Sequence, residues 1–208
     1  FYTDTTGKLM LPEPLAYGNY KLVEQCTAHG YVLDPEPVPF TVDGSQTVVT
    51  VTKYNTAQKG TITVSKSGEV FSSVMESDGV YQPVYAASGL AGAVYEIYAD
   101  EDIVTPDGTI RAKKGELVGR IATGPSGAGT SGLLYLGRYK VLETKAPRGM
   151  TISSKPQIVE LTYAGETVEV TSTEVSFYNE RQKAVISLSK TLEQDERFGI
   201  GMNGEILS

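Results

Sequence analysis

An internal repeat divides this chain into successive structural units. The segment Gln58–Lys66 (QKGTITVSK) returns as Gln182–Lys190 (QKAVISLSK), at an offset of 124 residues. An asparagine precedes each copy at the same offset, as Asn55 and Asn179. A repeat at a fixed spacing indicates that one folding unit follows another along the chain. Each copy of the segment therefore marks the point where one unit ends and the next begins.

A second repeated block supports this division. Tyr20–Glu24, followed by Gly30, corresponds to Tyr139–Glu143, followed by Gly149, at an offset of 119 residues. The two offsets differ by five residues, so one connecting loop differs in length between the units.

The repeat predicts three parts. Residues 1–58 are expected to be the C-terminal half of one module, residues 59–183 a complete module, and residues 184–208 the first strand or strands of a third. Because the repeat is cut at both ends and the chain begins at Phe1, we expect a fragment of a longer protein. The lack of a signal peptide or anchor in such a fragment says nothing about location.

The residue pattern predicts an all-β fold. In Thr61–Lys66 apolar and polar residues alternate, which is the period of a half-buried strand. A turn is expected at Ser67-Gly68, a flexible loop at Gly124–Gly129 and a short hairpin around Gly137. No segment has a convincing helical period, and many short strands at this spacing indicate a β-sandwich. Further strands are predicted at Tyr20–Glu24, Val38–Val42, Thr47–Asn55, Val70–Met75, Val80–Ala86, Leu90–Ala99, Gly115–Thr123, Leu133–Leu136, Arg138–Thr144, Ile158–Tyr163 and Val168–Asn179.

Lys66 shares the apolar face of its predicted strand with Ile62 and Val64. Its counterpart Lys190 shares a face with Ile186 and Leu188 in the same way. Lysine is almost never fully buried without a partner. One interpretation is a lysine at the strand end whose ammonium reaches water. The other is a buried lysine whose partners lie on other strands.

Two more polar residues lie on apolar faces. Glu143 alternates with Tyr139 and Val141, and Asn179 alternates with Val175 and Phe177. Lys66, Glu143 and Asn179 are therefore predicted to point from three strands into one core.

The motifs Ile62–Lys66, Tyr139–Gly149 and Phe177–Asn179 resemble the B-type repeat of Gram-positive collagen adhesins (Cna-B), which is also found in major and minor pilins. The resemblance covers the whole chain and implies tandem immunoglobulin-like or prealbumin-like β-sandwich modules. It also implies a spontaneous isopeptide bond between Lys66 and Asn179, with Glu143 as the proton shuttle.

The partial modules retain some of these positions. By the same resemblance, Glu24 and Asn55 are the equivalents of Glu143 and Asn179 in the first module, and Lys190 is the equivalent of Lys66 in the third.

The chemistry of these residue types agrees with the resemblance. Burial disfavours charge on both lysine and glutamate, so the pair can share one proton as neutral amine and neutral acid. A neutral amine is a nucleophile, and the acid can stabilise the developing oxyanion and protonate the leaving ammonia. Contact in a packed core supplies the effective concentration. This is one turnover within one molecule, so we expect no enzyme, no cofactor and no metal.

The predicted role is a structural stalk region of a cell-wall-anchored surface adhesin, located outside the cell. Its partners would be neighbouring repeats in the same chain. A net charge of −7 argues against nucleic acid and against an anionic membrane surface. The single cysteine, Cys26, excludes an intrachain disulfide framework.

Two alternative roles stay open. One is a pilin subunit polymerised by sortase, which would need an acceptor lysine motif and a sorting signal. The other is a module that binds carbohydrate or host matrix, which an exposed aromatic cluster at Tyr81 and Tyr85 would favour.

Three other patterns are weaker. Asp100, Glu101, Asp102 and Asp107 do not have the spacing of a calcium loop. Gly124–Gly132 lacks the Lys-Ser/Thr pair of a phosphate-binding loop. Cys26 and His29 would need a third, orienting group to act as a nucleophile pair. Each is expected to be an ordinary turn or loop.

Overall fold

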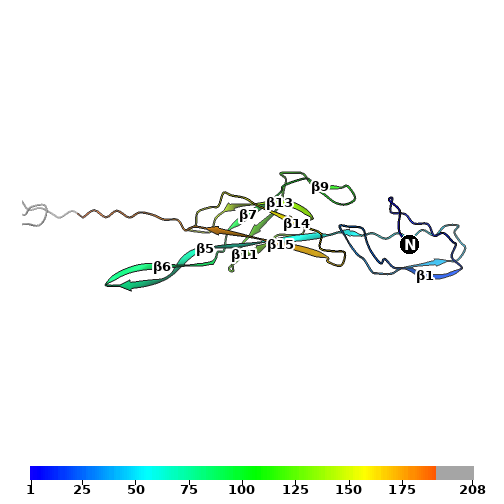
Figure 1. The fold of residues 1–208 in the computed structure, drawn as a ribbon, viewed down its shortest axis with the longest axis horizontal. Coiled ribbons are helices and arrows are strands. Elements are labelled where there is room, and N and C mark those ends of the chain that lie inside the picture. Colours follow the sequence, from blue (N-terminus) through cyan, green and yellow to red (C-terminus); the bar gives the residue numbers. More distant parts are fainter. Residues whose placement is uncertain (191–208) are drawn as a thin grey trace, which may run out of the picture.

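The computed structural model of the chain describes residues 1–190. Their regular structure is entirely β (Figure 1), and none of them forms a helix that could cross a membrane. The strands are β1 Gly18–Leu22, β2 Tyr31–Val32, β3 Val38–Val42, β4 Thr56–Ala57, β5 Lys59–Ser77, β6 Val80–Gly89, β7 Val94–Ala99, β8 Ile103–Val104, β9 Ile110–Ala112, β10 Leu117–Ala122, β11 Ala128–Thr130, β12 Leu134–Tyr135, β13 Gly137–Lys145, β14 Gln157–Leu161 and β15 Val170–Asn179.

Two sheets form the middle of the molecule. One has the strand order β10-β7-β13-β14. The other is organised around β5, which pairs with β6, β11 and β12 in antiparallel fashion and with β15 in parallel. The first and last strands of the middle module are therefore neighbours that run in the same direction.

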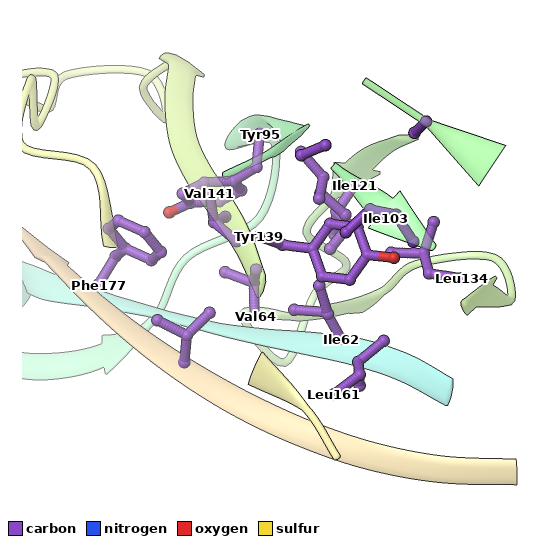
Figure 2. Packing of buried hydrophobic residues seen from close by; sticks show 14 of the residues in the cluster. Ile62, Val64, Tyr95, Ile103, Ile121, Leu134, Tyr139, Val141, Leu161 and Phe177 are labelled. Carbon is purple, nitrogen blue, oxygen red and sulfur yellow. The ribbon is translucent and has the colours of Figure 1, made fainter. Parts of the chain in front are cut away.

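The core lies between these sheets. Ile62 and Val64 of β5, with Phe177 of the neighbouring strand β15, face Tyr95 of β7 and Tyr139 of β13 from the other sheet, and all five side chains are buried (Figure 2). Alternation along each strand directs every second side chain inward. The inward-facing sets predicted for β5, β13 and β15 are confirmed.

β5 continues beyond the predicted turn at Ser67-Gly68, so that prediction was wrong. Gly68 is needed for close packing, because a Cβ there would lie 2.5 Å from the carbonyl oxygen of Asn179. The turn comes at Asp78-Gly79, where both residues have positive φ, as tight hairpins require. Beyond Val70, β5 and β6 form an exposed two-stranded arm.

The predicted hairpin around Gly137 was also wrong. The strand before this glycine, β12, pairs with β5, whereas β13 after it pairs with β7 and β14. A single glycine does not provide the two-residue turn of a tight hairpin. The chain instead crosses from one sheet to the other there. β14 and β15 likewise lie in different sheets.

The N-terminal residues repeat part of the middle module. In the antiparallel pair of β1 and β3, Gly18 pairs with Val42, just as Gly137 of β13 pairs with Leu161 of β14. The predicted strand Thr47–Asn55 is absent, and only Thr56–Ala57 pairs, with Tyr31–Val32. Its counterpart β15 pairs with β5 along its whole length, whereas residues 47–55 have no neighbouring strand in the described part of the chain. The predicted third module falls on residues 184–208, of which 191–208 lie outside the described residues.

The segment predicted as a flexible loop, Gly124–Gly129, packs tightly against β5. The amide of Lys66 donates a hydrogen bond to the carbonyl of Gly127 at 2.7 Å, and β11 begins at the next residue. Gly127 has φ +84°, and a Cβ there would lie 2.3 Å from the carbonyl oxygen of Lys66. The loop thus helps to fix the backbone of Lys66.

Gly127→Ala should therefore destabilise the protein strongly. Gly92→Ala is the matched control, because Gly92 has φ +83° but open space at its Cβ position. Both substitutions carry the strain of a positive φ, about 1 kcal/mol or more, and Gly127→Ala should cost at least about 2 kcal/mol beyond that. Urea unfolding of the two variants measures the difference, and equal midpoints would contradict this packing.

Candidate functional site: a buried lysine, glutamate and asparagine

Lys66 lies near the end of the inward face of β5 and is buried. Its side chain has no exposed surface, so the interpretation in which the ammonium reaches water is excluded for this residue. Burial lowers the pKa of Lys66, because the charged form loses its hydration, and the nearby Glu143 opposes this shift. The position therefore favours the neutral amine more than a surface lysine position does.

Glu143 approaches Lys66 from the opposite sheet. It lies on β13, and its Oε1 is 3.1 Å from Nζ of Lys66, with both side chains fully buried. The other oxygen, Oε2, accepts a hydrogen bond of 2.7 Å from the backbone amide of Ser153. This carboxyl group is thus fixed by backbone on one side and faces the amine on the other.

Asn179 completes the group as the last residue of β15. Its Nδ2 donates to both oxygens of Glu143, at 2.8 and 3.0 Å. The parallel register places Phe177 opposite Lys66, so Asn179 lies two residues further along, opposite Gly68. The structure therefore brings together the three residues that were predicted from the sequence to point into one core. They come from three strands in two sheets.

Three buried side-chain nitrogen or oxygen atoms of the described residues have no hydrogen-bond partner, and all belong to this region. They are Nζ of Lys66, Oδ1 of Asn179 and the hydroxyl of Tyr95. Nζ contacts the carboxyl of Glu143 without the alignment of a hydrogen bond. Unpaired buried polar groups cost about 1–3 kcal/mol each, so such a cluster needs an explanation.

Tyr95 is a neighbour of the site that the sequence did not single out. Its ring packs 4.7 Å from that of Phe177, between centroids. Burial, and then the charge of Glu143, raises the pKa of Tyr95 well above its ordinary value. The sequence signal was only a tyrosine on an apolar face, and that pattern is common in cores.

Glu24 and Asn55 lie together in the N-terminal part. Nδ2 of Asn55 donates to Oε2 of Glu24 at 2.8 Å, and both residues are half-buried. Lys190 is exposed. The structure thus pairs Glu24 with Asn55 and leaves Lys190 in the exposed segment after β15.

The acidic residues Asp102 and Asp107 make ordinary turn contacts in the structure. Asp102 binds Lys113 at 3.0 Å, Asp107 binds the hydroxyl of Thr105, and the described residues hold no cluster of three His, Cys, Asp or Glu side chains. Cys26 is exposed, and the ring of His29 packs against Tyr163.

The chain belongs to the SpaA prealbumin-like fold domain family, whose sequence model matches residues 1–57 and 85–176, more than half of the chain. The match includes Glu24, Asn55 and Glu143 and does not reach Lys66 or Asn179. It confirms the predicted all-β, prealbumin-like fold and the resemblance to pilin-type Cna-B domains.

Solved structures with a similar fold come from Gram-positive bacteria. The Bacillus anthracis TIE protein aligns with a TM-score of 0.52 at 23% identity, covering 86% of this chain and 28% of that protein. GBS52, the minor pilin of Streptococcus agalactiae, aligns with a TM-score of 0.39 at 20% identity, covering 90% and 70%. This chain therefore spans less than a third of the TIE protein. No curated protein matches the sequence.

The buried Lys66 should make stability depend on pH when the amine is left free, as in an Asn179→Ala variant. An unfolded lysine keeps its proton up to about its ordinary pKa of 10.5, whereas folded Lys66 loses it earlier. Between the two values the unfolded chain binds more protons, so unfolding free energy should rise with pH. Each unit of depression should contribute about 1.4 kcal/mol.

The control for this measurement is the double variant Lys66→Met, Asn179→Ala, which lacks the titrating amine. Urea unfolding of both variants between pH 7 and 10.5 should show a widening gap in favour of the variant that retains Lys66. Parallel curves would mean that Lys66 is not desolvated.

Proposed function

We propose that this chain is a stalk segment of a Gram-positive surface protein, and that an isopeptide bond between Lys66 and Asn179 closes its middle module. The observation that carries the proposal is the contact of a fully buried lysine with Glu143, which in turn binds Asn179. The amine nitrogen and the amide oxygen lack hydrogen-bond partners. Bond formation would convert the amine and the amide into one neutral amide.

The reaction needs no group beyond these three side chains. Lys66 first transfers a proton to Glu143, which leaves a neutral amine beside a neutral acid. A half-turn of the Asn179 amide then exchanges Nδ2 for Oδ1, so that the acid donates to the carbonyl oxygen. This hydrogen bond stabilises the oxyanion that develops as Nζ attacks.

Atoms and protons balance in the second half of the reaction. The Nζ–Cγ bond forms, the Cγ–Nδ2 bond breaks, and Nδ2 leaves as ammonia. Glu143 passes its proton to the leaving nitrogen and takes one from Nζ, so it ends as the neutral acid that it was before the attack, and it retains the proton that Lys66 first gave up. The hydrogen bond from the Ser153 amide holds Glu143 in place throughout.

The position of the bond suits a segment under tension. The chain enters the middle module along β5 and leaves it at the end of β15, and these strands are parallel neighbours. A bond from Lys66 to Asn179 would carry force directly from the entering strand to the leaving strand. The 113-residue loop between them (66 to 179) would carry none, and its closure would stabilise the fold by about 5 kcal/mol in the chain-entropy estimate.

The junction before β5 supports the same role. Gln58 is buried, its Nε2 donates to the carbonyl of Gly165 at 2.9 Å, and its Oε1 accepts from the amide of Ala164 at 2.9 Å. The amide of Leu33 donates to the carbonyl of Glu166 at 2.8 Å. These contacts tie the N-terminal part to the middle module, as a stiff stalk requires.

The pilin alternative shares this mechanical design, and the family match supports it at the level of the fold. A pilin would use neighbouring subunits as partners and would be located at the cell surface, as we propose for the stalk. The aromatic cluster predicted at Tyr81 and Tyr85 gives little support to a ligand-binding module. Tyr81 is exposed, but Tyr85 is half-buried under the guanidinium of Arg181, 3.7 Å from its ring.

Intact mass spectrometry tests the proposed bond. The wild-type chain should be lighter than its sequence by one ammonia, and reducing agents should not restore the mass. Lys66→Ala, Asn179→Ala and Glu143→Ala should each have the unmodified mass. Glu160→Ala removes an exposed acid from the adjacent strand β14 and should retain the loss.

Peptide mapping assigns the loss, because the bond should join the peptides that contain Lys66 and Asn179. A wild-type chain of unmodified mass would contradict the proposal. So would a Glu143→Ala variant that still loses ammonia, since it would remove Glu143 from the mechanism.

A further inference from the structure

The hydroxyl of Tyr95 is buried beside the proposed site without a hydrogen-bond partner. Tyr95 has no exposed surface, and its hydroxyl is one of the three unpaired side-chain atoms of the described residues. Leaving a buried hydroxyl unpaired is destabilising. A phenylalanine fills a core position without that penalty, as the neighbouring Phe177 does. The hydroxyl of Tyr95 therefore needs an explanation that packing does not give.

The strand register places Tyr95 next to the reacting groups. In the pair of β7 and β13, Tyr95 lies directly opposite Glu143. Side chains in such a pair share one face of the sheet, with Cβ atoms about 4.5–5.5 Å apart. From the facing sheet, the ring of Phe177 packs against that of Tyr95, with 4.7 Å between centroids (Figure 2). Tyr95 thus lies against the carboxyl group that Asn179 binds and against the residue two positions before Asn179.

Both oxygens of Glu143 are already occupied in the unreacted site. Oε1 lies 3.1 Å from Nζ of Lys66 and accepts a hydrogen bond of 2.8 Å from Nδ2 of Asn179. Oε2 accepts from the same Nδ2 at 3.0 Å and from the amide of Ser153 at 2.7 Å. A carboxylate has about four lone-pair sites in all. Glu143 therefore offers the Tyr95 hydroxyl no free acceptor in this state.

The half-turn of the Asn179 amide changes this arrangement. It exchanges Nδ2 for Oδ1 at the carboxyl group, so that an acceptor takes the place of a donor. Oδ1, which is unpaired in the unreacted site, then lies beside the neutral Glu143, in the part of the core that Tyr95 faces. A carbonyl oxygen has two lone pairs and can accept from two donors. Glu143 supplies one of them.

We propose that the Tyr95 hydroxyl is the second donor, and that it donates a hydrogen bond to Oδ1 of Asn179 as Nζ of Lys66 attacks. The inference rests on the isopeptide bond of the proposed function. Tyr95 transfers no proton, so the balance of the reaction is unchanged: the Nζ–Cγ bond forms, Nδ2 leaves as ammonia, and the hydroxyl keeps its hydrogen. After the reaction, the same hydroxyl pairs with the carbonyl of the new amide.

The protonation of Tyr95 suits this role. Burial, and then the charge of Glu143, raises the pKa of Tyr95 well above its ordinary value of 10.0. The hydroxyl therefore keeps its proton at neutral pH and acts as a neutral donor. A donor that is already fixed in a water-excluded core stabilises developing negative charge without reorganisation of solvent.

Tyr95→Phe tests the proposal, because it removes one hydroxyl and keeps the ring. The full chain is made in a short cell-free pulse, synthesis is stopped, and the fraction lighter by one ammonia is followed by intact mass spectrometry. Removal of one oxyanion donor slows acyl transfer by about 100–1,000-fold. The half-time of ammonia loss in Tyr95→Phe should lengthen to the same extent.

Tyr139→Phe is the matched control for the loss of a buried hydroxyl. Tyr139 belongs to the same core, and its hydroxyl donates to the carbonyl of Tyr135 at 2.6 Å. Tyr139→Phe should lower stability, because it removes a hydrogen bond and leaves that carbonyl without this donor. Its half-time of ammonia loss should be that of the wild type.

Urea unfolding in a background without the bond separates chemistry from packing. Lys66→Met cannot react but keeps Glu143 and Asn179. In that background, Tyr95→Phe removes an unpaired hydroxyl and should leave the unfolding midpoint unchanged or raise it, whereas Tyr139→Phe should lower it. A slower reaction without a loss of stability is a result that a purely structural role of Tyr95 does not give.

The remaining outcomes decide between this inference and the proposed function. If Tyr95→Phe loses ammonia as fast as the wild type, the inference is overturned and the proposed function stands. The same holds if both tyrosine variants are equally slow, or if Tyr95→Phe lowers the midpoint as Tyr139→Phe does, since the delay would then come from packing. If the wild type loses no ammonia, both fail.

Discussion

The contact between Lys66 and Glu143 is the interaction on which the rest of the site depends. It joins the two sheets through their core, because Lys66 lies on β5 and Glu143 on β13. Burying two charges costs several kcal/mol of hydration free energy for each ion. Their attraction offsets this cost only when the geometry is good and further hydrogen bonds are made. A shared proton avoids that cost, and the reaction with Asn179 would remove both charges permanently. The unfavourable burial of the Lys66 and Glu143 charges would thus favour formation of the isopeptide bond between Lys66 and Asn179.

The fold supplies this contact by placing the first and last strands of the module side by side. The parallel pairing of β5 with β15 aligns Lys66 and Asn179, and β13 brings Glu143 from the facing sheet. Gly127 and Gly68 allow backbone to pack closely against Lys66 and Asn179. The same arrangement, reduced to Glu24 and Asn55, remains in the N-terminal part. The family relationship accounts for the sandwich, and these particular contacts account for the proposed chemistry.

Alternation along single strands was enough to predict which residues point inward. Ile62, Val64 and Lys66 are local signals of that kind, and so is Glu143. Pairing was not predictable in the same way, because it depends on residues far away in the sequence. Thr47–Asn55 has the pattern of a strand but, within residues 1–190, no neighbour to pair with. The hairpin predicted around Gly137 is instead a crossing between sheets. Ser153 and Tyr95 approach Glu143 from loops and strands whose placement only the fold defines.

Single-molecule stretching of the chain from its two ends tests the central claim most directly. In the wild type, force should pass from β5 to β15 through the Lys66–Asn179 bond, so residues 67–178 should add no length at any force below covalent rupture. In Lys66→Ala the same module should unfold and release up to about 400 Å of chain, at 3.3–3.6 Å for each of the residues between 66 and 179. An equal extension in wild type and variant would contradict the account.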